Sequence, residues 1–244
     1  MNKLIDRTIM VIGASGKIGK VLSSYFLAEG ANVVISARNP DRLTELKQEL
    51  DSERVLDIPV DATVPADCEK LFASGQEKFG KIDTVVISAG TWQRLNISDS
   101  AVKARESFDA LYTSIFLPSA IAAFTAGTFL REQKGGGLVV NISSHAAVRP
   151  ELLGNLSYGS MKAAAYALML RLRAEHKQAG TKVRFTDIQS ALVDTPKNRK
   201  AFPKLTESDW RKTVQISDIA DWIIAHIDDP NIPAEVLFDS AVKV

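Results

Sequence analysis

Short runs of apolar, β-branched residues alternate with stretches of helical spacing along the whole chain of 244 residues. The runs are mostly apolar throughout, which is typical of strands with both faces covered. The predicted strands lie at residues 8–12, 32–36, 54–60, 82–88, 138–142, 182–188 and 235–238. The predicted helices lie at residues 17–29, 40–50, 65–79, 98–134 and 157–178. This order predicts an α/β chain built on a doubly wound parallel sheet of about seven strands with helices on both faces.

The composition is close to that of an average globular protein, with 45% hydrophobic and 24% charged residues. The 30 Lys and Arg balance the 29 Asp and Glu, so no net basic field favours a nucleic acid or an acidic membrane as a partner. No repeat, linker or low-complexity segment divides the chain. We therefore expect a single domain over residues 1–244, with a substrate-loop insertion at about 190–215.

The cysteine content, the N-terminal segment and the longest apolar stretch indicate in which compartment the protein is expected and whether it spans a membrane. The single cysteine, Cys68, excludes an internal disulfide and a cysteine-cluster metal site, which suits a reducing compartment. We expect a cytoplasmic protein without a bound metal. The polar segment 1–7 contains no signal-peptide pattern. Polar residues interrupt the apolar stretch 114–130, which falls short of the ~20 apolar residues that a membrane span needs.

A glycine-rich turn joins the first predicted strand to the first predicted helix. Its candidate binding residues are Gly13, Ser15, Gly16, Lys17, Ile18 and Gly19. Glycines let the backbone turn tightly and approach a pyrophosphate, whose charge is met by free N–H groups at the helix N-terminus. At this place in a βαβ series, the turn predicts the dinucleotide-binding loop of a Rossmann fold.

The end of the second predicted strand indicates which dinucleotide binds. An NAD site usually places an acidic residue there to accept from the ribose 2′-hydroxyl, whereas a 2′-phosphate needs a cation. Here Ala37 and Arg38 stand with no acid before Asp41, and Lys17 adds a second positive charge in the same loop region. The planar fork of an arginine suits a phosphate. The sequence therefore predicts NADP, with Arg38 at the 2′-phosphate.

Tyr158 and Lys162 stand four residues apart at the start of a predicted helix, downstream of Ser144. Four residues make about one helical turn, so the hydroxyl and the ammonium share a face and can act together. The spacing is common by chance. Its meaning depends on the neighbouring motifs.

These motifs occur together, and in the same order, in short-chain dehydrogenases/reductases, a family that this chain resembles over nearly its whole length. The matching segments are the glycine loop, Asp61, Ser88-Ala89-Gly90, residues 141–144, Tyr158-x-x-x-Lys162 and Val193-x-Thr195. The resemblance implies coenzyme contacts at the strand ends: Asp61 and Ala62 at adenine, Ala89 and Gly90 along the adenosine, and Val193 and Thr195 at the nicotinamide carboxamide.

The resemblance also implies an activity, the interconversion of a carbonyl and a secondary alcohol by hydride transfer, with Tyr158 as general acid or base. A free phenol, with a pKa near ~10, is poorly suited to this at neutral pH. The Lys162 ammonium and the positive charge of the oxidised nicotinamide would lower that pKa. Ser144, with Ser143 as its nearest rival, would hydrogen-bond the substrate oxygen, and Lys162 would also hold the nicotinamide ribose.

Several positions depart from the family pattern. Gly13 and Gly16 are three residues apart instead of four, as in the extended members of the family, and Ser88 replaces an Asn before Ala-Gly. Ser114 aligns with an Asn that completes a proton relay through water to the lysine, and its hydroxyl could still hold a water. Ser190-Ala191 replaces a Pro-Gly pair under the nicotinamide.

These departures leave a second interpretation open, an NADP(H)-binding sensor or scaffold with the same fold and little or no turnover. Retention of Ser144, Tyr158 and Lys162 favours an enzyme, because a non-catalytic protein has no chemical need for all three. A hydrolase is disfavoured. His145 lacks an acidic orienter, and the adjacent serines lack a glycine-flanked nucleophile elbow.

The expected ligands and partners are few. A small-molecule carbonyl or alcohol substrate is expected near Trp92, Gln93, and residues 145–153 and 196–210, which follow strand ends. The predicted helical regions 98–134 and 158–178 contain more Ala, Leu and Ile than one buried face needs, which leaves apolar surface for a partner. Because family members commonly bury these helices in an interface, the resemblance implies a homodimer or homotetramer.

Overall fold

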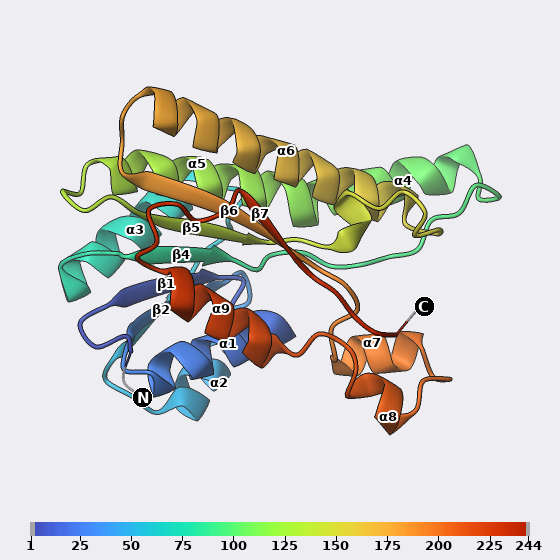
Figure 1. The fold of residues 1–244 in the computed structure, drawn as a ribbon, viewed down its shortest axis with the longest axis horizontal. Helices are drawn as coiled ribbons and strands as arrows, with labels where there is room; N and C mark the ends of the chain where they lie inside the picture. The colour runs from blue at the N-terminus through green and yellow to red at the C-terminus, as the bar shows by residue number, and fades with distance from the viewer. Residues whose placement is uncertain (1–2, 243–244) are drawn as a thin grey trace.

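A seven-stranded parallel sheet forms the centre of the molecule (Figure 1). The computed structural model describes residues 3–242. The strands are β1 (Thr8–Ile12), β2 (Asn32–Ala37), β3 (Val55–Pro59), β4 (Thr84–Ile87), β5 (Gly137–Ile142), β6 (Val183–Ser190) and β7 (Glu235–Phe238). Their order is β3-β2-β1-β4-β5-β6-β7, so the direction of sheet growth reverses between β1 and β4. The predicted doubly wound parallel sheet is confirmed.

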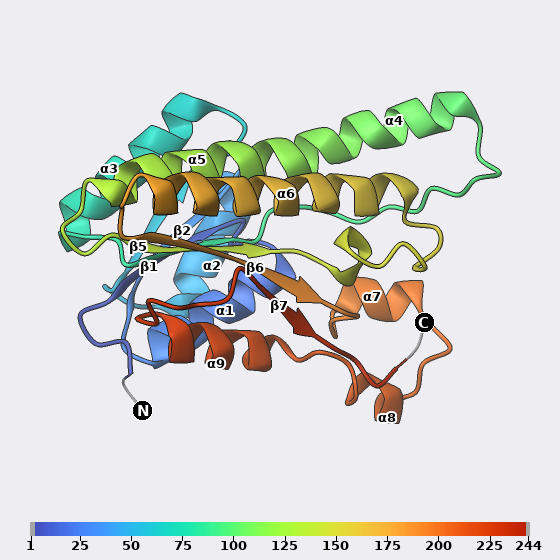
Figure 2. The ribbon, with the colours of Figure 1, turned by 45° about the horizontal axis from the view of Figure 1, so that its top comes forward.

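Helices cover both faces of the sheet (Figures 1 and 2). One layer contains α1 (Lys17–Ala28), α2 (Pro40–Leu50) and α9 (Ile216–His226). The other contains α3 (Pro65–Phe79), α4 (Ala101–Leu111), α5 (Leu117–Arg131) and α6 (Leu156–Gln178). Each layer closes over its own apolar core, because successive side chains of a strand point to opposite faces of the sheet. This explains why the strands are apolar throughout.

The C-terminal third contains helices that the sequence analysis did not predict. Helix α9 buries Ile219 and Ile223 in the core that it shares with α1. Its isoleucines recur at helical spacing, so the signal was present in the sequence. Two short helices, α7 (Pro196–Ala201) and α8 (Glu207–Trp210), lie in the segment between β6 and α9.

The predicted helical region 98–134 forms a continuous helix over residues 101–131, in which a π-helical turn, Tyr112–Phe116, joins α4 to α5. By length and composition alone this helix could cross a membrane, since an 18-residue window has a mean hydropathy of 1.5. Within the fold, α5 packs its Ala122, Ala123 and Ala126 into the core beside α3. A core helix of a soluble protein passes the same test, so the observation is weak evidence for a span.

Candidate active site

A cavity of about 230 Å³ opens at the carboxyl ends of the central strands, where the sheet reverses its order. Ligands of open α/β sheets bind at this position. Nine of the predicted site residues line the cavity: Gly13, Ser15, Gly16, Arg38, Asp61, Ala62, Ala89, Gly90 and Ser114. The structure therefore brings the predicted adenosine residues together around one cavity.

The glycine loop is held close to both neighbouring strands and to its own helix. Gly13 has a φ of +84°, and a Cβ there would lie 2.9 Å from the backbone of Ser88 at the end of β4. A Cβ at Gly19 would lie 2.5 Å from the carbonyl oxygen of Gly13. Neither position has room for a side chain. The two glycines therefore allow the tight packing of the turn, and Gly13, Ser15 and Gly16 line the cavity at the start of α1, as in a dinucleotide-binding loop.

Two arginines line the cavity at the end of β2. Arg38 is exposed there, and Arg42 donates from Nη2 to the carbonyl oxygen of Ser15, 2.8 Å away. Asn39 caps α2 by accepting from the backbone N–H of Arg42, which fixes the first turn of the helix beside the glycine loop. The sequence analysis missed Arg42. The Asn39-Pro40 pair is typical of a helix start, and this signal could have placed Arg42 in the first turn of α2, beside the glycine loop.

Asp61 also lines this cavity, after β3, the strand next to β2. Its Oδ1 accepts from the backbone N–H and the hydroxyl of Thr63, at 2.9 Å and 2.8 Å. The backbone hydrogen bond from Thr63 is the main reason that the pKa of Asp61 is lowered, and the charge of Arg38 contributes less. The Asp61 carboxylate is therefore held in place by Thr63, in the same turn of the chain.

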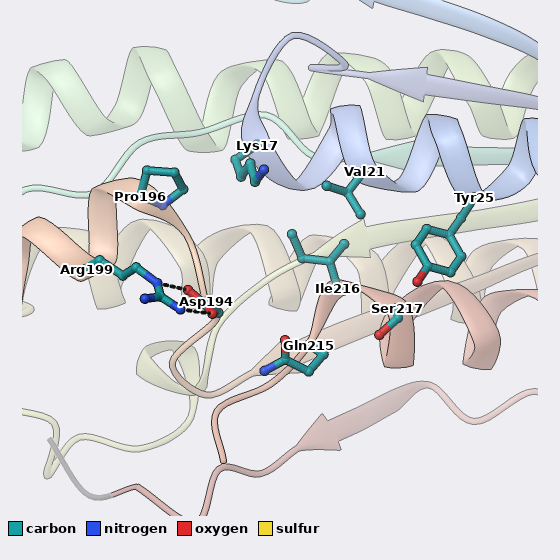
Figure 3. Close-up of a pocket in the computed structure, with 9 residues that line it drawn as sticks. All are labelled: Lys17, Val21, Tyr25, Asp194, Pro196, Arg199, Gln215, Ile216 and Ser217. Carbon is teal, nitrogen blue, oxygen red and sulfur yellow. Dashed lines mark hydrogen bonds and ion pairs between the residues drawn. The ribbon is translucent and has the colours of Figure 1, made fainter. Parts of the chain in front are cut away.

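The side chain of Lys17 lies in a different cavity, of about 390 Å³, between α1 and the segment after β6 (Figure 3). The lining residues are Lys17, Val21, Tyr25, Asp194, Pro196, Arg199, Gln215, Ile216 and Ser217. Arg199 holds Asp194 through two hydrogen bonds, and these bonds and, less strongly, the charge of Lys17 lower the pKa of Asp194. The second positive side chain that lines the cavity with Arg38 is thus Arg42, whereas Lys17 lines the other cavity.

The other predicted catalytic residues gather where α6 begins above the end of β5. A Cβ at Gly159 would lie 2.7 Å from the carbonyl oxygen of Ala146, so the first turn of α6 packs directly on the backbone after Ser144. Ser144 accepts 3.3 Å from the backbone N–H of Ala146. Burial raises the pKa of the Tyr158 phenol, and the Ser144 hydroxyl beside it acts in the opposite sense. The structure therefore brings Ser144 and Tyr158 together.

Lys162 lies one helical turn after Tyr158 and points down to the sheet. Its Nζ donates to the carbonyl oxygen of Ile142 at 2.8 Å, and a Cβ at Gly90 would lie 3.9 Å from the same Nζ. Burial lowers the pKa of Lys162 to about 8, and the charge of Asp187 counteracts part of this change. The expected lowering of the Tyr158 pKa by Lys162 is not seen here, because burial of the phenol dominates.

Ser114 lies in the π-helical turn between α4 and α5, a kind of turn that is frequent at functional sites. Its Oγ is buried without a hydrogen-bond partner among the described residues, and it lines the cavity. A Cβ at Gly90 would lie 3.7 Å from the backbone oxygen of Ser114 and 3.9 Å from Nζ of Lys162. Both residues therefore lie beside Gly90. The alignment of Ser114 with the relay position is consistent with this placement.

The residues predicted at the nicotinamide end lie outside the cavity. Val193 is buried, and Thr195 caps α7 by accepting from the backbone N–H of Asn198. Ile18 packs on the core beneath α1. Lys197 donates from Nζ to the hydroxyl of Thr91, 2.7 Å away, and so joins the segment after β6 to the loop after β4. This link spans the end of β5, which lies between those strands.

His145 has an acidic neighbour, which the sequence analysis did not expect. Its Nε2 lies 3.7 Å from Oδ1 of Asp239, too far for a hydrogen bond, and Arg149 binds the same oxygen at 2.7 Å. Burial, followed by the charge of Arg149, lowers the pKa of His145.

Between residues 3 and 242, no group of three or more His, Cys, Asp or Glu side chains could hold a metal ion.

Comparison with known proteins assigns this geometry to a family. The sequence profile of a family described as short chain dehydrogenase matches residues 7–206, most of the chain. This chain belongs to the short-chain dehydrogenase/reductase family. Members of this family are oxidoreductases that use nicotinamide coenzymes and act on small molecules.

Related oxidoreductases match along nearly their full lengths. An uncharacterized oxidoreductase of Staphylococcus epidermidis is 28% identical over 231 residues, 95% of each chain. Another, from Staphylococcus aureus strain N315, is 30% identical over 230 residues, 94% of each chain.

Solved structures share the fold. A short-chain type dehydrogenase/reductase from Mycobacterium ulcerans superposes with a TM-score of 0.82 at 24% identity, covering 96% of this chain and 88% of its own. A short chain dehydrogenase from Mycobacterium smegmatis gives a TM-score of 0.81 at 23% identity, covering 100% and 96%.

Proposed function

We propose that this short-chain dehydrogenase/reductase interconverts a small carbonyl compound and a secondary alcohol with NADP(H), using Tyr158 as general acid or base. The observation that carries the proposal is the junction of α6 and β5, where Tyr158 adjoins Ser144 and Lys162 reaches the backbone of β5. The residues present fit a dinucleotide, since the glycine loop lines a cavity at the N-terminus of α1 and two arginines line the same cavity.

The protein residues would divide the work as follows. When bound, the reduced coenzyme supplies a hydride to the carbonyl carbon. Ser144 hydrogen-bonds the carbonyl oxygen, and Tyr158 gives that oxygen its phenolic proton as negative charge develops. Lys162 holds the coenzyme ribose and places a positive charge near the phenol. In the reverse direction, Tyr158 accepts the alcohol proton.

The charge of Lys162 is essential to this assignment. Burial raises the pKa of Tyr158, which makes the phenol a weaker acid. Lys162, with a pKa of about 8, is protonated at lower pH and loses its charge as the pH rises through that value. We therefore propose that proton transfer is most effective while Lys162 is charged and a positively charged oxidised nicotinamide lies beside Tyr158.

Ser114 takes the position that an Asn occupies in the family relay. Its buried Oγ has no partner in the described part of the chain, so it has the capacity to bind a water between the π-helical turn and Lys162. We propose that this water would replace the amide in the relay. The shorter side chain would hold it through a single hydroxyl group.

The coenzyme preference should depend on two arginines. We expect NADPH to bind more tightly than NADH, because Arg38 and Arg42 line the cavity at the end of β2. Arg38→Ala or Arg42→Ala should weaken NADPH binding by about tenfold and leave NADH binding unchanged, since each arginine can form charge-assisted hydrogen bonds only with the 2′-phosphate. Fluorescence titration with both coenzymes measures this.

Lys17→Ala is the matched control for these variants. Its side chain lies in the separate cavity of Figure 3, so the preference for NADPH should persist. Equal affinities of the parent protein for the two coenzymes would remove the role assigned to the arginines. If only Lys17→Ala lost the preference for NADPH, the 2′-phosphate would have to bind on the Lys17 side of the glycine loop.

Turnover tests the proposed reaction itself. NADPH oxidation is followed in air against a panel of ketones and aldehydes. We expect Tyr158→Phe to lower turnover by about 100-fold or more while coenzyme binding is retained, because the variant lacks the proton donor. Tyr25→Phe, in the separate cavity of Figure 3, should remain active. Tight NADPH binding without turnover of any compound would favour the sensor or scaffold.

We also propose that the chain forms a homodimer or homotetramer. Apolar side chains remain exposed along α4, the π-helical turn and α5, where Val102 is 69% and Phe124 is 64% exposed. Phe108 and Tyr112 lie partly exposed on the same continuous helix. A second copy could cover such a surface.

Light scattering at micromolar concentration should therefore give two or four times the chain mass of 26.6 kDa. Phe124→Asp should shift the mass toward that of a single chain, because it places a charge in the proposed interface. A monomeric mass for the parent would contradict the assembly.

A further inference from the structure

Asp187 is a buried carboxylate to which the proposed mechanism gives no role. It lies on β6 with no exposed surface, and its Oδ2 accepts a hydrogen bond from Nδ2 of Asn141, 2.7 Å away. Its Oδ1 has no hydrogen-bond partner among the described residues. Burial of a carboxylate is unfavourable unless hydrogen bonds and an opposite charge offset the lost hydration. The fold therefore retains this group at a cost to its stability.

The sheet register places Asp187 under the helix that carries Lys162. Phe185 belongs to the core on the α5 and α6 side, so Asp187, two residues later, faces the same side. Asp187 is paired in register with Asn141, and Lys162 donates to the carbonyl of the next residue, Ile142. Within residues 3–242, Asp187 is the only buried carboxylate and Lys162 the only buried Lys or Arg.

The two buried groups stabilise each other's charge. Burial raises the pKa of Asp187 to about 6, while the hydrogen bond from Asn141 and the charge of Lys162 act against the rise. Burial lowers the pKa of Lys162 to about 8, while the charge of Asp187 acts against the fall. Between these two values the carboxylate and the ammonium are both charged. Each then supplies the counter-charge that the other's burial requires.

We propose that Asp187 is a positioning residue of the Tyr158 site, whose negative charge keeps the Lys162 ammonium protonated and bound to β5, a role that rests on the proposed function. A neutral Lys162 would exert no positive field on the Tyr158 phenol, which would then be a weaker proton donor. Asp187 thereby sets the upper pH limit of the site without contacting substrate or coenzyme.

Two tyrosines and a histidine also face this region. Tyr158 and Tyr166 each lie one turn from Lys162 on α6, and burial raises the pKa of both phenols, that of Tyr166 to about 12. Both are neutral near neutral pH and supply no negative charge. Burial lowers the pKa of His145, which is therefore uncharged as well.

Glu235 is the remaining acidic group. It lies on the edge strand β7, paired in register with Asp187, and is half-exposed. After burial, Glu235 also contributes to the raised pKa of Tyr166, so its side chain lies close to that phenol. Solvent screens an exposed carboxylate more strongly than a buried one, so its effect on Lys162 should be smaller than that of Asp187.

The pKa of Lys162 tests the proposal directly and requires no turnover. With ¹³Cε-labelled lysine, the Lys162 resonance is assigned by its loss in Lys162→Arg and is followed by NMR as the pH changes. Asp187→Asn should lower the Lys162 pKa by about one unit, because the charged form loses its partner. The alkaline limb of the kcat/KM profile should move to lower pH by the same amount.

Asp57→Asn is the matched control, because Asp57 is a half-buried carboxylate on β3, at the opposite edge of the sheet. Asp187→Asn keeps an acceptor for Asn141, and Asp187→Ala is a second uncharged variant should the first not fold. An unchanged Lys162 pKa in a folded uncharged variant, or an equal fall in Asp57→Asn, would overturn the proposal. A lowered pKa in a protein without turnover would support the pairing and contradict the proposed function.

Discussion

The first turn of α6 packs so closely on the backbone after β5 that the rest of the site depends on this contact. At Gly159 there is no space for a side chain between the helix and the Ala146 carbonyl. One turn further along the helix, Lys162 donates to the carbonyl of Ile142, the last residue of β5. Ser157, buried beside them, hydrogen-bonds at 2.6 Å to Ser107 on α4. Because these contacts are mostly to backbone, they fix the helix position whatever the neighbouring loops do. The site is therefore built on rigid elements.

The two halves of the site are held in different ways. The proposed adenosine half is an open cavity whose positive charge comes from Arg42 on α2 and Arg38 in the loop before it. In the proposed nicotinamide half, side chains already have partners, since Thr195 caps α7 and Lys197 bonds to Thr91. The first half would recognise the charge of a ligand, whereas the second is held by hydrogen bonds within the protein. Substitutions in one half can therefore be tested separately from substitutions in the other.

Sequence patterns predicted the features that depend on local residue chemistry and on the order of the elements along the chain. The alternation of elements gave the sheet, and the glycine loop followed because its backbone conformation limits the residue type at Gly13. Side-chain direction was harder to predict. Lys17 and Arg42 both lie near the loop in sequence or space, yet the helix geometry sends only Arg42 to the cavity. The importance of Asp187 could not be predicted, because it depends on a register between strands 46 residues apart in the chain.

Tyr158 is a more effective proton donor when positive charge beside it lowers its pKa, which burial raises in the free protein. Ultraviolet difference titration measures the phenolate directly, with Tyr158→Phe as the reference that removes the signal of the other three tyrosines. The titration is performed with and without saturating NADP⁺. We predict that the pKa of Tyr158 falls when NADP⁺ is bound. A pKa that stays unchanged or rises would contradict the assignment of Tyr158 as the proton donor.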